Sequence, residues 1–324
     1  MNTIHLTIIL VLGWFGSVAC SKSDDMKEQQ QVQSLQKLPG VLYYEWADDG
    51  VYRLKPAALN KTVFIEDVAE RNGWSISQNG QFLLECFDDP EQDYDAYLFR
   101  IKKIPDGTVV SSFKYYPKEG SLNIATGYIS PDGSMIAIEP TSEEGIVIVD
   151  QKGNLKQAIE KINNEKVQGR PVWTPDNCLM FLHHQLLLKT NTTFNDATLI
   201  KELDFDQLRD PAISPDGNKI AFSGNGHVWT MDKNGNNLQQ VTTSSLEEVA
   251  PEFSPDGHYL LVGANYHTTM GGGPWGYYYN LKAIPVDGKR YTLDDSQQSA
   301  EVINIQIPGE DISSASGKTY WLAQ

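Results

Sequence analysis

The amino-acid sequence predicts an all-β protein, a six-bladed β-propeller made of four-stranded blades. A tight-turn motif recurs along the chain, an apolar strand follows each copy, and a second strand and a polar turn come next. Four short strands in each repeat of roughly 40–50 residues are typical of propeller blades, and no helical pattern competes with them. A blade buries its faces only against neighbouring blades, so we expect the repeats to close into a ring.

The clearest copy of the motif is Ala212–Gly224, AISPDGNKIAFSG. Pro215 presets φ at the first central position of a tight turn, and Asp216 and Gly217 tolerate the conformations that follow. The apolar segments on both sides predict two strands joined by this turn. The further copies are SISQNGQFLLECF at Gly80, YISPDGSMIAIEP at Gly133, VWTPDNCLMFLHH at Asn177, EFSPDGHYLLVGA at Gly257 and a weak DISSASGKTYWLA at Gly317.

The two ends of the repeat region are incomplete. Val41–Lys55 matches the second and third strands of a blade without a preceding turn motif, and the weak copy at Gly317 supplies a turn motif just before the chain stops. Together the two ends complete one blade, which gives six blades in all. Both ends offer a candidate for the same second strand, so a seventh, partial blade is the alternative.

The stretch 209–264 resembles the TolB-type propeller repeat through its successive segments SPDG, KIAFS, VWTMD, NG and VT. The resemblance covers roughly residues 40–324 and implies the fold. It implies little about function, because the same repeat serves periplasmic interaction proteins, peptidase gatekeeping domains and some lyases.

Several functional classes are not expected. The family's N-terminal α/β domain has no counterpart in this sequence, so a role in the Tol machinery is not expected. The sequence contains no Gly-x-Ser-x-Gly motif, which argues against a serine peptidase. The formal net charge of −16 argues against nucleic acid as a partner, because such a surface repels phosphate backbones.

The N-terminus predicts a secreted, lipid-anchored protein. Ile4–Ala19 is apolar and too short for a comfortable membrane span, as in a signal peptide covering residues 1–19. SVAC resembles the lipobox of bacterial lipoproteins, which implies acylation of Cys20 and anchoring to the outer membrane of the cell envelope, on either side. A simple secretory signal is the alternative. Residues 20–39 are polar and predict a flexible tether, followed by the propeller at 40–324.

The remaining cysteines, Cys86 and Cys178, lie in strands of non-adjacent repeats. Non-adjacent repeats do not lie side by side in a ring, so we expect two buried thiols and no disulfide.

Acidic residues gather in the loops between second and third strands of the first three blades, at 47–50, 88–95 and 139–145. Asp89, Glu91, Asp93 and Asp95 alternate as Ca²⁺ ligands could, but the loop lacks the glycine and the closing glutamate of an EF-hand. Solvated charge is the favoured interpretation.

Three histidines are expected on that same face. Aligning the third strands puts His184 and His227 at equivalent positions, and His267 lies in the matching loop of the next blade. Together they could hold a divalent metal, as His and Gln ligands do in propeller lyases acting on uronate sugars, and Gln185 is nearby. Loop histidines are more often simply exposed, so no cofactor is expected.

The loop Asn265–Tyr278 is the candidate ligand-binding loop, because it combines a triple glycine with aromatic side chains. Aromatic residues provide rigid, amphipathic contact area for partners and sugars. The candidate residues are Tyr266, His267, Met270, Trp275, Tyr277 and Tyr278. Alternatively, the same side chains fold inward and plug the mouth of the channel.

The function expected from the sequence is a lipid-anchored, cell-envelope propeller that binds or scaffolds protein or glycan ligands without catalysis. The alternative is a metal-dependent polysaccharide lyase of the oligogalacturonate type, built on the histidine arc.

Replacing the lipidation residue tests the anchor. Cys20→Ser should move the protein from the membrane fraction to the soluble fraction without altering its fold, because acyl chains supply the membrane affinity. Fractionation with immunoblotting measures this, and circular dichroism checks the fold. Mature wild-type protein that is soluble in the periplasm would contradict the anchor.

Overall fold

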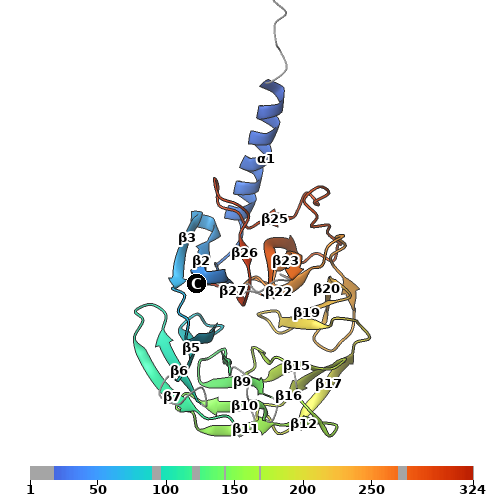
Figure 1. Ribbon diagram of the computed structural model, residues 1–324. Helices are drawn as coiled ribbons and strands as arrows, with labels where there is room; N and C mark the ends of the chain where they lie inside the picture. Colours follow the sequence, from blue (N-terminus) through green and yellow to red (C-terminus); the bar gives the residue numbers. More distant parts are fainter. Residues whose placement is uncertain are drawn as a thin grey trace, which may run out of the picture.

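The structure is a computed structural model that describes residues 18–89, 96–118, 125–141, 144–167, 169–268 and 276–323. Six antiparallel sheets, each built on a path of four strands, surround a central channel (Figure 1). The six-bladed propeller predicted from the repeats is therefore confirmed.

Five blades are continuous in the chain and run from the innermost strand outward. Blade 2 has β4 (Arg71–Ile76), β5 (Phe82–Asp88), β6 (Tyr97–Lys103) and β7 (Val109–Tyr115); blade 3 has β8 (Gly127–Ile129), β9 (Met135–Thr141), β10 (Gly145–Asp150) and β11 (Leu155–Ile159). Blade 4 has β14 (Val172–Trp173), β15 (Leu179–His183), β16 (Leu186–Thr190) and β17 (Ala197–Glu202); blade 5 has β18 (Arg209–Ile213), β19 (Lys219–Gly224), β20 (His227–Asp232) and β21 (Gln239–Gln240). Blade 6 has β22 (Val249–Phe253), β23 (Tyr259–Thr268), β24 (Tyr277–Pro285) and β25 (Ile303–Asn304).

Blade 1 joins the two ends of the repeat region. Its strand order is β27 (Thr319–Leu322), β1 (Val41–Trp46), β2 (Gly50–Lys55) and β3 (Asn60–Ile65). The short 3₁₀ helices η1 (Ala47–Asp49) and η2 (Pro56–Ala58) connect its strands. The composite blade is confirmed, and its register decides against a seventh blade.

The weak last copy of the motif differs from the alignment. Its TYWL segment was expected to match a second strand, but β27 is the innermost strand and Val41–Trp46 is the second. The preceding residues form β26 (Ser314–Ala315), which pairs with β24 of blade 6. In the other copies Asp or Asn stands before the last turn residue and accepts hydrogen bonds within the turn, whereas this copy has Ser316, whose Oγ accepts from the Ala47 amide of blade 1.

Hydrogen bonds inside the turn explain why the Ser-Pro-Asp-Gly motif recurs. Ser214 Oγ donates to Asp216 Oδ1 over 2.6 Å and accepts from the Lys219 amide at 2.9 Å, while Gly217 N donates to the Ser214 carbonyl. Gly217 adopts φ +70°, where a residue without Cβ is favoured. The side-chain hydroxyl at the equivalent position makes a hydrogen bond within its own turn in four other copies, at Ser77, Ser130, Thr174 and Ser254.

Apolar side chains from adjoining blades form the core. One cluster joins blades 2 and 3 through Phe99 and Ile136, and another joins blades 5 and 6 through Ala221 and Phe253. Cys86 and Cys178 are buried and free, as predicted.

The segment predicted to be a flexible tether is instead largely helical. α1 (Val18–Gln36) projects away from the ring beside blades 1 and 6 (Figure 1). Gln31 exchanges two 3.3 Å hydrogen bonds with the backbone of Val302 and Asn304, and Leu35 and Leu38 are buried in the core. Although the composition of this segment is polar, its C-terminal end packs against the ring. In the described part of the chain, no helix is long and apolar enough to cross a membrane.

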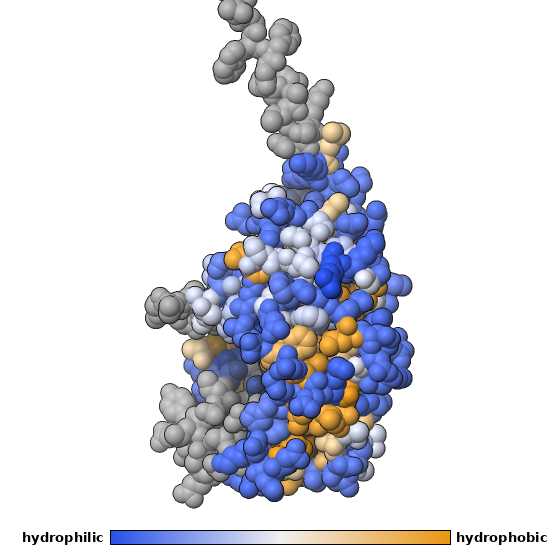
Figure 2. Space-filling view, turned by 90° about the vertical axis from the view of Figure 1, so that its right-hand side faces the viewer, coloured by the Kyte–Doolittle hydropathy of each residue, from blue (hydrophilic) through white to orange (hydrophobic). Residues whose placement is uncertain are grey.

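The flank of the ring that carries β17 and β20 is mostly hydrophilic, with hydrophobic side chains gathered toward its lower half (Figure 2). The helix that extends above the ring also presents a mostly hydrophilic surface.

Two glycines of the turn motif give a matched test of the fold. Gly133 and Gly257 both have positive φ, +80° and +72°, but a Cβ at Gly133 would lie 2.3 Å from the Phe82 ring, whereas one at Gly257 would meet nothing within 4 Å. Gly257→Ala should cost about 1–2 kcal/mol of unfolding free energy, and Gly133→Ala a further ~1–3 kcal/mol. Urea denaturation measures both variants. Equal losses would contradict the packing of Phe82 over this turn.

Candidate functional site

A cavity of about 330 Å³ occupies the central channel and is the candidate functional site. All six innermost strands line it, including Ile76 of blade 2, Tyr128 of blade 3 and Tyr320 of blade 1. The volume is at the lower end of the range of small-molecule sites.

Two positions of the innermost strand recur among the residues that line the cavity. Four residues before the Ser or Thr of the turn motif stand Arg170, Asp210 and Ala250, and two residues before it stand Tyr128 and Glu252. These positions are separated by the two-residue period of a strand, which puts their side chains on one face.

Asp210 and Ala250 adopt the left-handed region at φ +53° and +49°, and the strand register shifts beside each of them. Such β-bulges re-aim side chains and often lie beside functional sites. Asp210 Oδ2 accepts the Ala250 amide at 3.2 Å, which links blade 5 to blade 6 inside the channel. The sequence interpretation missed these residues, although comparing charged residues across the aligned repeats could have found them.

Two cations share the ring of Tyr128. Arg170 lies 5.0 Å and Lys318 Nζ 4.2 Å from its centroid, distances at which a cation is attracted to an aromatic face. Lys318 also donates to the Trp74 carbonyl at 3.1 Å and to Thr126 Oγ1 at 2.9 Å. The ammonium group is thus held between blades 1, 2 and 3.

Burial shifts the pKa of two channel residues toward each other. It raises the pKa of Glu252 to about 8, although Arg170 acts in the opposite direction. It lowers the pKa of Lys318 to about 8, and Arg170 acts in the same direction. Burial thus favours the neutral form of both side chains, the protonated carboxyl of Glu252 and the uncharged amine of Lys318.

Tyrosines from the β23–β24 hairpin form one wall of the channel mouth. Tyr266 and Tyr277 pack with ring centroids 5.7 Å apart, and both line the cavity. Arg209 lies 4.3 Å from the Tyr266 centroid and pairs with Glu247. The wall offers aromatic surface beside a guanidinium and a carboxylate.

The predicted binding loop divides between two sides of this hairpin. Tyr266 and Tyr277 face the channel, whereas His267 stacks on Tyr278 at 5.1 Å, and Tyr278 contacts Trp46 of blade 1. Successive side chains of a β-strand point to opposite faces, so neighbouring residues of the hairpin lie on different sides of it. Met270 and Trp275 lie outside the described residues.

The structure does not bring the predicted histidine arc together. His227 Nδ1 lies 2.9 Å from Glu248 Oε2, and His267 packs on Tyr278. His184 and His227 are also not equivalent, because the strand pairing matches His227 with Gly224 and Leu186 with His183. His184 therefore corresponds to Asn225 of blade 5.

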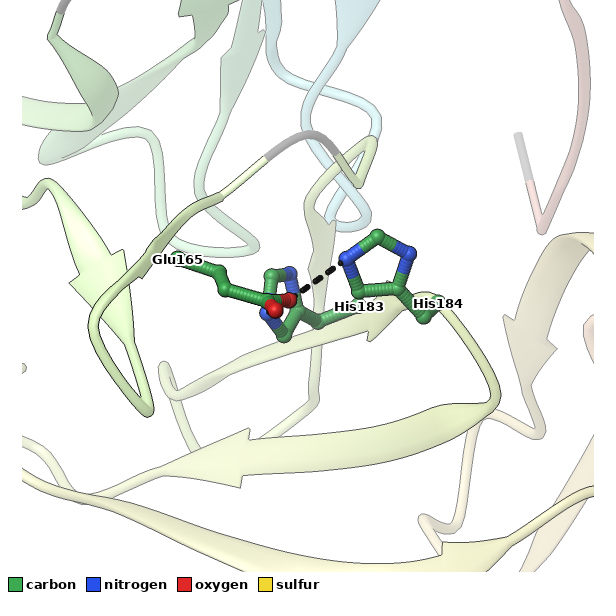
Figure 3. Close-up of side chains that lie close together, drawn as sticks. All are labelled: Glu165, His183 and His184. Carbon is green, nitrogen blue, oxygen red and sulfur yellow. Dashed lines mark ion pairs between the residues drawn. The ribbon is translucent and has the colours of Figure 1, made fainter.

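His184 instead lies beside Glu165 and His183 (Figure 3). Within the described residues, these three form the group whose ligand atoms all lie within 4.8 Å of one another. Of the alternating acidic loop, Asp89 is buried and pairs with Lys114 at 2.7 Å, and Glu91, Asp93 and Asp95 lie outside the described residues.

The fold and the channel place this protein among the six-bladed β-propellers. No family model matches the chain. A TolB from Acinetobacter baumannii is similar in structure, with 16% sequence identity, a TM-score of 0.58, and coverage of 87% of this chain and 66% of that chain. A putative TolB from Agrobacterium tumefaciens has 16% identity, a TM-score of 0.53, and coverage of 78% and 87%.

A chain of a nidogen/laminin complex is also similar, with 10% identity, a TM-score of 0.56, and coverage of 88% of this chain and 99% of that chain. At these identities the likeness shows a shared fold and not a shared function.

The pH dependence of stability tests the burial of Glu252. The folded protein keeps the Glu252 proton up to a pKa of about 8, whereas the unfolded chain releases it near 4.5. The stabilising contribution is therefore fully present below pH 4.5 and is lost as the pH rises to 8, with a slope of up to about 1.4 kcal/mol per pH unit.

Glu252→Gln removes this ionisation and keeps the side-chain shape. The free energy of unfolding of Glu252→Gln minus that of wild type should therefore grow as the pH rises from 5 to 8. Urea denaturation at several pH values measures this difference. A constant difference across that range would contradict a carboxyl whose proton is retained by burial.

Proposed function

We propose that this protein is a non-catalytic binding module of the cell envelope that captures a protein or glycan ligand at the channel mouth. The observation that carries the proposal is the convergence of aromatic and charged side chains on one end of a 330 Å³ cavity. Ligand sites commonly combine an apolar or aromatic lining with a few oriented polar groups.

The mouth is suited to an extended ligand that inserts one polar group. Tyr277 is 40% exposed and packs over Tyr266, which provides a platform for a sugar ring or a side chain. Behind it, the cationic groups of Arg170 and Lys318 lie 5.0 and 4.2 Å from the centroid of the Tyr128 ring. A carboxylate or another anionic group on the ligand would gain charge-assisted hydrogen bonds there.

The proposed lipid anchor, Cys20, lies near the beginning of α1, which projects away from the ring (Figure 1). Acylation of Cys20 would attach the membrane near the beginning of α1, and a helix of 19 residues is about 28 Å long. Because the end of α1 is packed into the core, the helix would act as a stalk that holds the ring away from the lipid surface.

The lyase interpretation depends on His184, His227 and His267 acting together. Each contacts a different partner, Glu165, Glu248 and Tyr278, so the geometry favours binding over that reaction.

Removing one tyrosine at the mouth tests the proposed site. Tyr277→Ala should weaken capture of the ligand by about tenfold or more, the effect of losing an interface hot spot, and should change the melting temperature little because the side chain is half-exposed. Tyr116→Ala is the matched control, since Tyr116 is 57% exposed on blade 2.

Photo-crosslinking identifies the ligand in this test. A benzophenone amino acid at position 277 should give a specific protein or glycan adduct in intact envelopes, and the same label at position 116 should not. Titration of that ligand by calorimetry then measures the affinities. Equal crosslinking at both positions, or unchanged affinity in Tyr277→Ala, would contradict binding at the mouth.

A further inference from the structure

A short hairpin between blades 3 and 4 brings a carboxylate to two adjacent histidines. β12 (Lys161–Ile162) and β13 (Glu165–Lys166) are joined by Asn163 and Asn164, both with positive φ, as in a tight hairpin turn. Within the described residues this is the one two-stranded sheet, so it lies outside the repeat plan of the blades.

The hairpin places Glu165 over the turn that joins β15 to β16 (Figure 3). Glu165 Oε2 lies 3.0 Å from His184 Nε2 and 3.9 Å from His183 Nε2. The two imidazole rings have centroids 4.6 Å apart and are tilted by 58°, so both rings are directed at the same carboxylate without stacking flat on each other.

The turn does not itself require a histidine. Blade 5 has a two-residue turn of the same length, with Asn225 and Gly226 in the positions of His184 and Gln185. Asn and Gly are the residues that such turns favour. His184 adopts φ +51° there, so the backbone conformation is kept and an imidazole is presented.

His183 supplies the buried part of the cluster. Its side chain is 2% exposed, and its Nε2 lies 3.9 Å from Glu165 Oε2, too far for a hydrogen bond. A buried imidazole whose Nε2 stands near a carboxylate without reaching hydrogen-bond distance needs an explanation. An ion pair between Glu165 and His184 does not supply one, because both side chains are more than half exposed and such pairs contribute little stability.

We propose that Glu165, His183 and His184 form a binding site for a divalent transition-metal ion of the Zn²⁺ type. Two imidazoles and one carboxylate are a common protein ligand set for Zn²⁺, in which a fourth position stays open to water. Bonds of about 2.0–2.2 Å in tetrahedral geometry place ligand atoms about 3.3 Å apart. The observed separations of 3.0 and 3.9 Å bracket this value, and Glu165 and His184 are exposed enough to adjust.

The metal would join the hairpin to blade 4 across the boundary between two blades. Its open position faces solvent, because Glu165 and His184 are 65% and 60% exposed. This site is separate from the channel and does not depend on the proposed ligand.

Calorimetric titration with ZnCl₂ tests the site in the full chain, without a histidine tag and after removal of bound metal with EDTA. Wild type should bind one equivalent, and His184→Ala and Glu165→Gln should each weaken binding at least about tenfold, the loss typical even of residues that only support a ligand. These exposed positions avoid the folding defect that replacing buried His183 could cause. Co²⁺ in place of Zn²⁺ should give the intense visible absorption of tetrahedral coordination.

The matched control is His258→Ala. His258 is 79% exposed and pairs with Asp256 at 3.2 Å, so it repeats an exposed histidine–carboxylate pair without a second imidazole. This variant should bind Zn²⁺ like wild type. The proposal is overturned if wild type binds no equivalent of Zn²⁺, if His184→Ala binds as tightly as wild type, or if His227→Ala removes binding, which would restore the histidine arc.

Discussion

The antiparallel pairing of β27 with β1 is the constraint on which the rest of the structure depends. It joins the two ends of the ring, pairing Val41 with Leu322 and Tyr44 with Thr319. Trp321 is buried beside this seam, and its indole donates to the Pro39 carbonyl at 2.7 Å across 282 positions of sequence. Blades bury their faces only against neighbours, so without this strand blades 1 and 6 would each expose a core face.

Ring closure also completes the channel. Lys318 precedes β27, and its ammonium group reaches the innermost strands of blades 2 and 3 because β27 is held in register. The same strand brings Tyr320 into the cavity lining. The candidate site and the stability of the ring therefore depend on the same few residues.

The channel contains positively charged side chains, although the chain as a whole is acidic. The whole chain is strongly acidic, with a formal net charge of −16, yet Arg170 and Lys318 place two cations around one tyrosine ring at its centre. Burial raises the pKa of Glu252 to about 8, which disfavours a negative charge on this carboxyl beside them. Such a centre favours anionic groups on a ligand even though the outer surface repels them at long range.

The segments that differ from the repeat are hairpins that lie between two blades or extend past the strands of one blade. The long β23–β24 hairpin supplies the tyrosine wall, and the β12–β13 hairpin supplies Glu165. The repeated strands provide a rigid frame, and residues that differ between blades provide the chemistry.

The sequence by itself determined the propeller, its six blades and the composite first blade, because turn residues and strand periodicity act over a few neighbouring positions. It also predicted a binding role for Tyr266 and Tyr277 from their place in an unusual loop, and both residues line the cavity. Only the tertiary structure decided that TYWL is an innermost strand, that residues 18–36 are helical, and that His184 meets Glu165 and His183 and not His227. These outcomes depend on register and on contacts between distant segments. A shift of one residue in pairing turns a side chain to the opposite face, and no local pattern encodes that choice.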